Sequence, residues 1–444
     1  MNYICLFITI ICCIFCYRRD KTVFSPSVAF SGLFSIVFIF ASSGWNGMYS
    51  ASASAYWLIT LGVLSFVFGT VVMKKYSLKT AFYITGKKIN VNDKLQSKMY
   101  WRMFWICILV LLSSIIMIGS YLLSGATLGD VYVVAAAATD GEQNELTKGG
   151  FQLLLESYIA YPLLYLLVPV SLVEFFSSYK KKYLFVALFL ALLRVCLDAR
   201  RIYLTAFILM IVICIYVHRK DYKYFNPKIY NRFKCFKKYS FLIVIFIFFF
   251  FSYVSSQRSI AKLGEDESST LVTLVEYYGG SVQFFGYCIE KTFKDYTFGF
   301  SSLRGLLAPF FGVLKLIGIE SPSLLKEANQ YLVTLHETIF NISPTKPYNS
   351  FATCFFQFYC DFGVIGIVFL SFFYGAFAEN IFEKMVVLKS KRAEAAYIFF
   401  FANILMLSFV NMQTVLALNF WPLILVRYLY PAKELKRNRF SSNS

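Results

Sequence analysis

Charged residues and histidines are scarce in this chain of 444 residues. Only 15% of its residues are charged, against roughly 25% in an average soluble domain. There are two histidines, His218 and His336, which excludes a histidine-rich metal site. The cysteines show no zinc-type spacing, and neither a glycine-rich phosphate loop nor an internal repeat occurs. The sequence therefore predicts no metal site and no cofactor.

Hydrophobic residues, by contrast, are abundant. They make up 58% of the chain, and aromatic residues alone make up 20%. A soluble chain has roughly 45–50% apolar residues, and this chain cannot hide its apolar surface inside one core. A lipid bilayer must solvate most of that surface, so we expect an all-α, polytopic integral membrane protein.

Eleven apolar runs are long enough to cross the hydrocarbon of a bilayer, which needs about 20 residues for a helix. The expected spans are 2–17, 28–46, 55–73, 101–123, 153–175, 183–199, 202–217, 239–255, 362–382, 395–412 and 414–430. They divide the chain into an N-terminal membrane bundle (1–255), a large outer loop (256–350), a C-terminal membrane bundle (351–430) and a basic cytoplasmic tail (431–444).

Lysine and arginine predict the orientation of these spans. The 43 basic and 24 acidic residues give a net charge of +19, a balance that is typical of nucleic-acid-binding proteins but also of inner-face membrane anchors. When the N-terminus is placed outside, thirty of the 43 basic residues fall in the inner segments. This distribution predicts an outer N-terminus and an inner C-terminus, and it requires no nucleic acid.

Most of the 11 cysteines fall inside the expected spans, including Cys13 and Cys16. We expect apolar packing there, because a free cysteine behaves as a small hydrophobic residue. Cys288, Cys354 and Cys360 lie on or near the outer side, where a single disulfide stays open as an alternative.

The outer side carries two substantial segments, 124–152 and 256–350. The second is too long to be a connector, and long ordered loops often carry function. Its stretches Val275–Ile289 and Phe298–Ile319 are aromatic and apolar, with single charges and glycines. This pattern indicates helices that lie at the outer membrane–water interface.

Arg200 and Arg201 violate the charge bias at the outer end of a hairpin of spans. Arginine binds phosphate in a bidentate manner, so a phosphate or diphosphate is a natural partner. The alternative is a pair of interfacial anchors beside Asp198. Arg194 lies about two turns earlier, inside the preceding span, and either faces the same cavity or pairs with an acid such as Glu174.

Arg258 directly follows a span and opens the large outer loop. It is a candidate for a second contact to an anionic headgroup, and simple anchoring is the alternative. Lys262, Arg304 and Lys315 are weaker candidates, because interfacial helices usually carry scattered basic residues.

His336 is the outward-facing histidine and is a candidate base for activating a hydroxyl. The competing carboxylates are Glu276, Glu337 and Asp361. Asp361 opens a span in the sequence Cys-Asp-Phe-Gly, so capping of that helix is its alternative role.

Several motifs together resemble one family. They are Tyr17-Arg18-Arg19 with Phe24-Ser25-Pro26, Arg200-Arg201-Ile202-Tyr203-Leu204, Pro347-Tyr348-Asn349-Ser350-Phe351, Tyr359-Cys360-Asp361-Phe362-Gly363-Val364-Ile365-Gly366, and Gly375. The chain is similar in these motifs, and in its order of spans, to the polytopic O-antigen and capsular oligosaccharide repeat-unit polymerases (Wzy).

The resemblance implies a membrane-embedded fold of the GT-C type in the cytoplasmic (inner) membrane. It implies transfer of an undecaprenyl-diphosphate-linked glycan to a hydroxyl of a lipid-linked repeat unit. The arginines would hold the diphosphate, and His336, Glu276 or Asp361 would orient the hydroxyl. Tyr348 and Asn349 would contact substrate. Membrane lipids, a Wzz-like chain-length regulator and a flippase are the implied partners.

Three rival functions stay open. An O-antigen ligase would use the same chemistry on a different acceptor, although the Pro-Tyr-Asn and Asp-Phe-Gly motifs favour a polymerase. A flippase or transporter is generally built from repeats with charges at mid-membrane, and no repeat occurs here. A non-catalytic membrane scaffold would leave the outer arginines dispensable.

Overall fold

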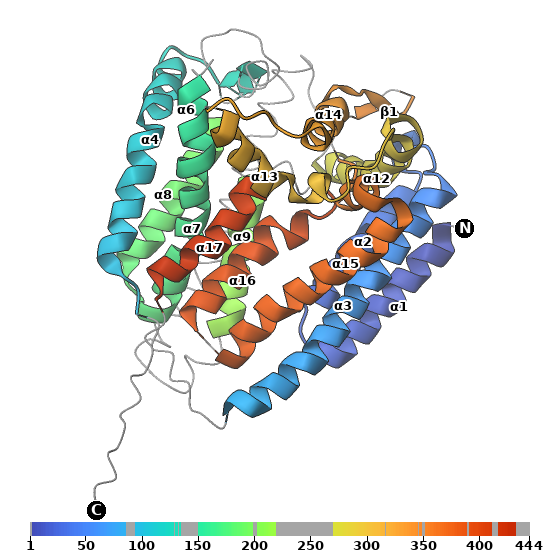
Figure 1. Cartoon of the computed structure of the whole chain (residues 1–444), viewed down its shortest axis with the longest axis horizontal. Coiled ribbons are helices and arrows are strands. Elements are labelled where there is room, and N and C mark those ends of the chain that lie inside the picture. Colours follow the sequence, from blue (N-terminus) through green and yellow to red (C-terminus); the bar gives the residue numbers. More distant parts are fainter. Residues whose placement is uncertain are drawn as a thin grey trace, which may run out of the picture.

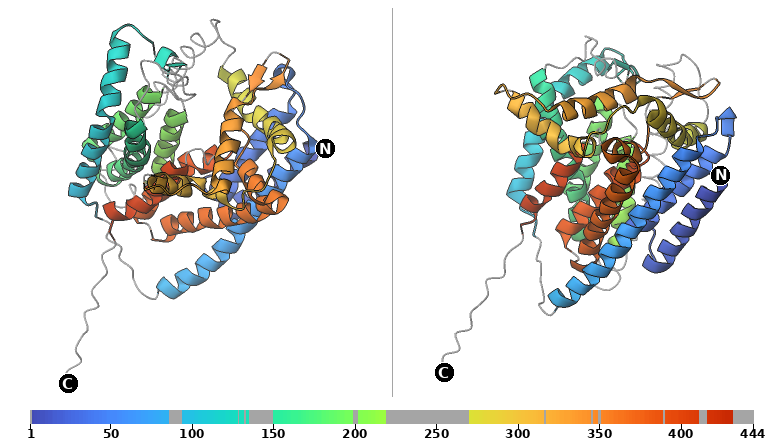
Figure 2. Two further views of the ribbon diagram at one scale, coloured as in Figure 1. Left: turned by 45° about the horizontal axis from the view of Figure 1, so that its top comes forward. Right: turned by 45° about the vertical axis from the view of Figure 1, so that its right-hand side comes forward.

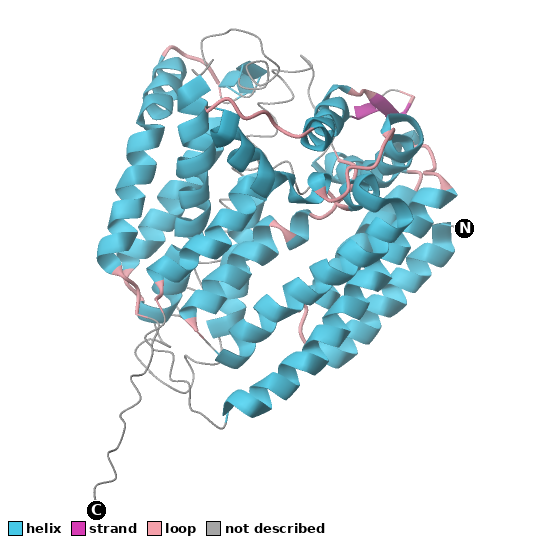
Figure 3. Cartoon of the chain, viewed as in Figure 1, coloured by secondary structure: helices cyan, strands magenta, loops and turns pink. Residues whose placement is uncertain are grey.

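A computed structural model describes most of the chain, and within the described part the protein is almost entirely helical (Figure 3). The described residues are 2–85, 94–127, 129–131, 133–134, 150–198, 202–218, 270–315, 317–344, 346–348, 351–388, 390–410 and 416–431. The expected span 239–255 and the basic tail at 432–444 lie outside them.

Five helices of the described chain are long and apolar enough to cross a membrane. They are α1 (Asn2–Asp20), the stretch Ala53–Tyr76 of α3 (Ala53–Thr85), α4 (Ser97–Leu123), Phe151–Ser178 and the stretch Phe355–Val387 of α15 (Phe355–Leu388). Two shorter apolar helices are α2 (Pro26–Ser42) and α9 (Ile202–His218). The expectation of an all-α membrane protein is thereby confirmed at the level of class.

The remaining expected spans that fall in the described chain also form helices. These are α8 (Lys181–Asp198), α16 (Lys391–Asn403) and α17 (Leu416–Leu429). The stretch Phe151–Ser178 combines α6 (Gly150–Leu155), a π-helical turn η2 (Glu156–Ala160) and α7 (Tyr161–Ser178).

Burial separates the central helix from the peripheral ones. In Phe151–Ser178, 94% of the apolar window is buried inside the protein, whereas in α1 and α4 the share is only 22%. Large apolar side chains such as Phe7 and Trp105 are exposed on these outer helices. Lipid is the natural solvent for such surfaces, so α7 lies at the centre and α1 and α4 face the bilayer.

The helices form two groups that lie side by side (Figures 1 and 2). The first group contains α1, α2, α3 and α15, and the second contains α4, α7, α8 and α9. Helix α16 connects the two groups, since it contacts both α15 and α7, and α17 packs against α16 and α7.

Glycines allow α3 and α15 to pack closely along their lengths. A Cβ on Gly375 would lie 2.0 Å from the backbone oxygen of Phe66, and one on Gly69 would lie 2.0 Å from that of Phe372. Small residues permit such close approach of membrane helices, where no hydrophobic effect drives association.

The segment that the sequence analysis placed outside contains α12 (Thr270–Tyr287), a π-helical turn η3 (Cys288–Thr292), α13 (Phe300–Lys315) and α14 (Ser323–Glu337). Helices were expected at the positions of α12 and α13, whereas α14 was not predicted. A short antiparallel hairpin of β1 (Phe340–Ser343) and β2 (Lys346–Tyr348) follows, which the sequence analysis did not predict. We call the end of the molecule with β1, β2 and α12 the hairpin end; α6 lies toward it as well (Figure 1).

The expected start of the span at Phe362 coincides with a break inside α15 (Phe355–Leu388), where two helical stretches meet. Helix α15 begins at Phe355, and its backbone leaves helical geometry at Phe362 (φ −148°, ψ 23°) and Gly363 (φ 63°, ψ −141°). Glycine suits this left-handed φ because it has no Cβ. Asp361 therefore precedes a break inside the helix instead of opening it.

The ten cysteines of the described chain are free thiols. Cys288, Cys354 and Cys360 are fully buried, so the open alternative of a disulfide among them is not formed. Burial raises the pKa of Cys354, just before α15, above its ordinary value, which suits a packing role.

Candidate functional site

Arg194 lies near the end of α8 and is almost completely buried, with 4% of its surface exposed. Its Nη2 atom donates a hydrogen bond of 2.7 Å to the hydroxyl of Tyr203 on α9. The guanidinium carbon also lies 3.8 Å from the ring centroid of Tyr161 and 4.3 Å from that of Tyr203. Two aromatic rings thus hold the cation, an interaction that strengthens when water is excluded.

Glu156 extends this arrangement through Tyr161. It is fully buried in the π-helical turn η2, and it accepts hydrogen bonds from Gln152 Nε2 at 3.0 Å and from the Tyr161 hydroxyl at 3.3 Å. Ser114 on α4 donates a further bond to it. We call Ser114, Glu156, Tyr161, Arg194 and Tyr203 the arginine network.

The sequence analysis missed Glu156. Its signal was present: Glu156 is one of only two acids, with Glu174, inside the apolar run 153–175, and ionisable residues within membrane spans usually have a function or a partner. Its position on a π-helical turn is a second indication, because such turns often occur at functional sites.

A small cavity of about 20 Å³ lies beside Arg194, between α7, α8, α9 and Asn403 of α16. This volume holds about one water molecule. Apolar side chains, including Leu164, Phe207 and Met210, form most of its wall.

The expected alternative of an Arg194–Glu174 pair is wrong. Glu174 instead accepts from Lys391 Nζ at 2.9 Å and from the Tyr430 hydroxyl at 3.0 Å. The physical reason is distance along α7: Tyr161, which contacts Arg194, and Glu174 are separated by about 20 Å at 1.5 Å per residue.

Asp361 caps a different helix from the one in which it lies. Its fully buried carboxylate accepts hydrogen bonds from Thr297 Oγ1 at 2.6 Å and from the backbone nitrogens of Gly299, Ser301 and Ser302 at 2.8–2.9 Å. These groups stand at the start of α13. The negative charge thus satisfies the free N–H groups and the positive end of the α13 dipole.

Tyr348 and Glu276 lie on two neighbouring elements, β2 and α12. The Tyr348 hydroxyl donates a hydrogen bond of 3.0 Å to the backbone oxygen of Tyr277, the residue that follows Glu276 on α12. The ring lies against Gly280, where a Cβ would be only 2.7 Å from it. Burial raises the pKa of Tyr348 well above its ordinary value, so the hydroxyl stays a neutral donor. Glu276 is itself buried.

Arg304 links helices α13 and α14. Its Nε atom on α13 donates to Asn329 Oδ1 on α14. Burial lowers the pKa of Arg304 from its ordinary value. Lys315 lies in the last turn of α13, where a cation is favourable for the helix dipole.

The other predicted site residues fall outside the described part of the chain. They are Arg200, Arg201, Arg258, Asn349 and Lys262, together with the side chains of His336 and Glu337 on α14. Of the described candidates, Tyr348 on β2 and Glu276 on α12 lie near each other, whereas Arg194 lies on α8, in the second group of helices.

The chain matches no family model, no curated protein and no solved structure. The class of protein therefore follows from the helices and contacts described above. The protein is a membrane-embedded, all-α protein with a buried arginine network in one group of helices and a helix, α13, that is capped by the buried carboxylate of Asp361.

Proposed function

We propose that this protein polymerises undecaprenyl-diphosphate-linked oligosaccharide repeat units into O-antigen or capsular polysaccharide, at the outer face of the cytoplasmic membrane. The observation that carries the proposal is the buried guanidinium of Arg194, held by Tyr161 and Tyr203. It lies just before the Arg200–Arg201 pair in the chain. A set of arginines at a helix hairpin suits a diphosphate, because guanidinium groups bind phosphate oxygens in pairs.

In this reaction the bond between the anomeric carbon of the donor glycan and the diphosphate oxygen breaks. An acceptor hydroxyl forms the new glycosidic bond at that carbon, and its proton passes to a base. The diphosphate leaves on its lipid. Because the leaving group is already activated, the protein needs to stabilise its negative charge and orient the hydroxyl.

The residues of the chain divide between these two tasks. Arg200, Arg201, Arg258 and Arg194 would hold the diphosphate. His336 or Glu276 would act as the base, with Tyr348 and Asn349 contacting the sugar. The carboxylate of Asp361 already accepts four hydrogen bonds, so its best-supported task is to fix α13.

The finer architecture is part of the same proposal. It comprises eleven spans, a GT-C-type fold, an outer N-terminus and an inner C-terminus. The start of α1 lies toward the hairpin end, as this orientation requires if the segment 256–350 is outside (Figure 1). Membrane lipids, a chain-length regulator and a flippase would be the partners.

Reconstitution tests the proposal. The full chain, purified into lipid vesicles, is incubated with the lipid-diphosphate-linked repeat unit of its host. A ladder of longer glycans and release of undecaprenyl diphosphate are expected. Arg200→Ala and Arg201→Ala should abolish the ladder while the protein stays in the membrane, and full-length polymer from both variants would contradict the diphosphate role.

Deletion of the gene separates the rival functions. Loss of a polymerase leaves single repeat units on the acceptor, loss of a ligase leaves no glycan on the lipid A core, and loss of a flippase strands the repeat unit on the inner face. An unchanged glycan pattern would favour a scaffold.

A further inference from the structure

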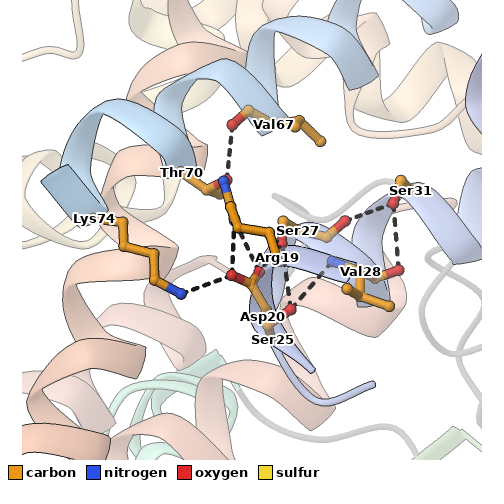
Figure 4. Close-up of polar contacts among 9 residues, drawn as sticks. All are labelled: Arg19, Asp20, Ser25, Ser27, Val28, Ser31, Val67, Thr70 and Lys74. Carbon is orange, nitrogen blue, oxygen red and sulfur yellow. Dashed lines mark hydrogen bonds and ion pairs between the residues drawn. The ribbon is translucent and has the colours of Figure 1, made fainter. Parts of the chain in front are cut away.

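A second polar cluster lies where the end of α1, the start of α2 and α3 meet (Figure 4), away from the hairpin end (Figure 1). Its centre is the carboxylate of Asp20, whose side chain is 1% exposed. Arg19 binds it with two hydrogen bonds of 2.8 Å, Lys74 of α3 with one of 2.7 Å, and Ser27 of α2 with one of 2.6 Å. Asp20 is therefore fully compensated.

Glu379 on α15 is buried beside this cluster without such compensation. Its side chain is 0% exposed, and neither carboxyl oxygen has a hydrogen-bond partner in the described chain. The charges that act on it are those of Asp20, Lys74, Arg19 and Glu383. Figure 4 shows that Arg19 and Lys74, the two cations, are both directed at Asp20.

The charge balance around Glu379 lacks one positive charge. Asp20, Glu379 and Glu383 are three acids against the two cations Arg19 and Lys74, and Glu383 is buried as well, one helical turn further along α15. A bare buried carboxylate costs several kcal/mol. The described residues contain no group of metal-binding side chains that would supply the charge as a metal ion.

We propose that Glu379 is a buried proton-binding site at this end of the molecule. A hydronium ion gives its proton to one carboxyl oxygen of Glu379: one O–H bond of the hydronium breaks, an O–H bond forms on the carboxyl group, and a water molecule is released. The neutral acid removes the uncompensated charge. This inference does not depend on the proposed glycosyl transfer.

Titratable groups from each neighbouring element set the conditions of this protonation. They are Cys16, Arg19 and Asp20 on α1, Lys74 on α3, Glu383 on α15 and Tyr397 on α16. The charge of Glu379 also acts on the hydroxyl of Tyr397. From α2, the neighbouring polar side chains are the neutral Ser25 and Ser27.

Loss of the proton has a structural consequence through Arg19. The Nη1 atom of Arg19 is buried and has no hydrogen-bond partner in the described chain. A charged Glu379 would compete with Asp20 for this guanidinium. The competition would weaken the junction that now joins α1, α2 and α3.

Infrared difference spectroscopy tests the proposal on the full chain in lipid nanodiscs. A titration from neutral to alkaline pH should remove a carbonyl-stretch band of a protonated carboxylic acid. Glu379→Gln should lack this band, whereas the matched variant Glu383→Gln should keep it. Retention of the whole band in Glu379→Gln would overturn the assignment.

Thermal stability gives a second readout. The folded protein holds a proton that an unfolded glutamate, with a pKa of about 4.3, has released at neutral pH. Stability therefore falls as the pH rises through the range in which the band disappears. Glu379→Gln should abolish that fall. A stability change that follows sodium concentration at constant pH, and is lost in Glu379→Gln, would instead define a metal-cation site and overturn the proposal.

A further variant covers the case in which Glu379→Gln does not fold. Glu379→Asp keeps the acid but shortens it, so the band should shift in frequency and in its alkaline midpoint. An unshifted band would place the proton on another residue, and the absence of any such band from the wild type at neutral pH would exclude bound proton altogether.

Discussion

Arg194 and Arg427 both contact tyrosine, but in different surroundings. Arg194 is buried between two rings, whereas Arg427 is exposed at the end of α17, where Nη2 donates to Tyr428 at 3.0 Å and the ring centroid is 5.0 Å away. A cation–π contact contributes about 0.5–1 kcal/mol when exposed and about 2 kcal/mol when water is excluded. The two arginines therefore form a matched pair for experiment.

We expect Arg194→Lys to lower polymer formation by about tenfold or more while the protein remains folded. Lysine keeps the charge but loses the planar group that lies on Tyr161 and Tyr203, and a difference of about 1.4 kcal/mol equals tenfold in rate. The measurement is the initial rate of ladder formation in vesicles.

Arg427→Lys is the control for this substitution, and its rate should stay close to that of the wild type. Equal losses in both variants would indicate a general effect on folding. Full activity of Arg194→Lys would remove the arginine network from the proposed site.

At the scale of elements, Asp361 joins α13 to the break in α15. We expect Asp361→Asn to destabilise the protein by about 1–3 kcal/mol, because an amide cannot accept all four hydrogen bonds and leaves buried N–H groups unpaired. The apparent melting temperature in nanodiscs should fall accordingly.

The matched control for the cap is Asp130→Asn. Asp130 accepts from the backbone nitrogen and hydroxyl of Thr127 at 2.7 Å, which lower its pKa, but these groups are exposed. We expect a change within about 0.5 kcal/mol. If the melting temperatures of both variants fell by the same amount, burial would not make the Asp361 cap more stabilising than the exposed Asp130 cap.

The contact of α3 with α15 gives another prediction. We expect Gly375→Leu to destabilise by about 3 kcal/mol, at the upper end for overpacking, because the new Cβ meets the rigid backbone at Phe66. Gly119→Leu on α4 is the control, since a Cβ there has no neighbour within 4 Å. Better helix propensity should leave that control as stable as the wild type or more so, and melting curves that coincide for both variants would argue against close α3–α15 packing.

For the whole molecule, the sequence could predict those features that the bilayer determines, namely the number of apolar residues in a spanning helix. Hydrocarbon thickness fixes the length of a spanning helix, so α1, α3 and α4 were visible as apolar runs. Helices α12 and α13 were also predictable, because their aromatic and apolar stretches carry only single charges.

Contacts between distant segments were not predictable in the same way. Asp361 was expected to cap its own helix, but its partners lie some 60 residues earlier, at Thr297 and Ser301. The hydrogen bonds of Glu156 form only in the folded protein, where η2 places it beside Tyr161 and α4 contributes Ser114. No local period or motif records which helix becomes the neighbour of another.

The orientation of the whole molecule is open to a direct measurement at two exposed serines. Ser43 follows α2 near the hairpin end, where Tyr49 N bonds to the β1 oxygen of Ile342, and Ser97 begins α4 near the end of α17, where Gln96 N bonds to Leu429. In a cysteine-free background, Ser43→Cys should react with a membrane-impermeant maleimide in intact cells, and Ser97→Cys only after permeabilisation. The reverse pattern would place the proposed site on the inner face, where no polymerase of exported repeat units can act.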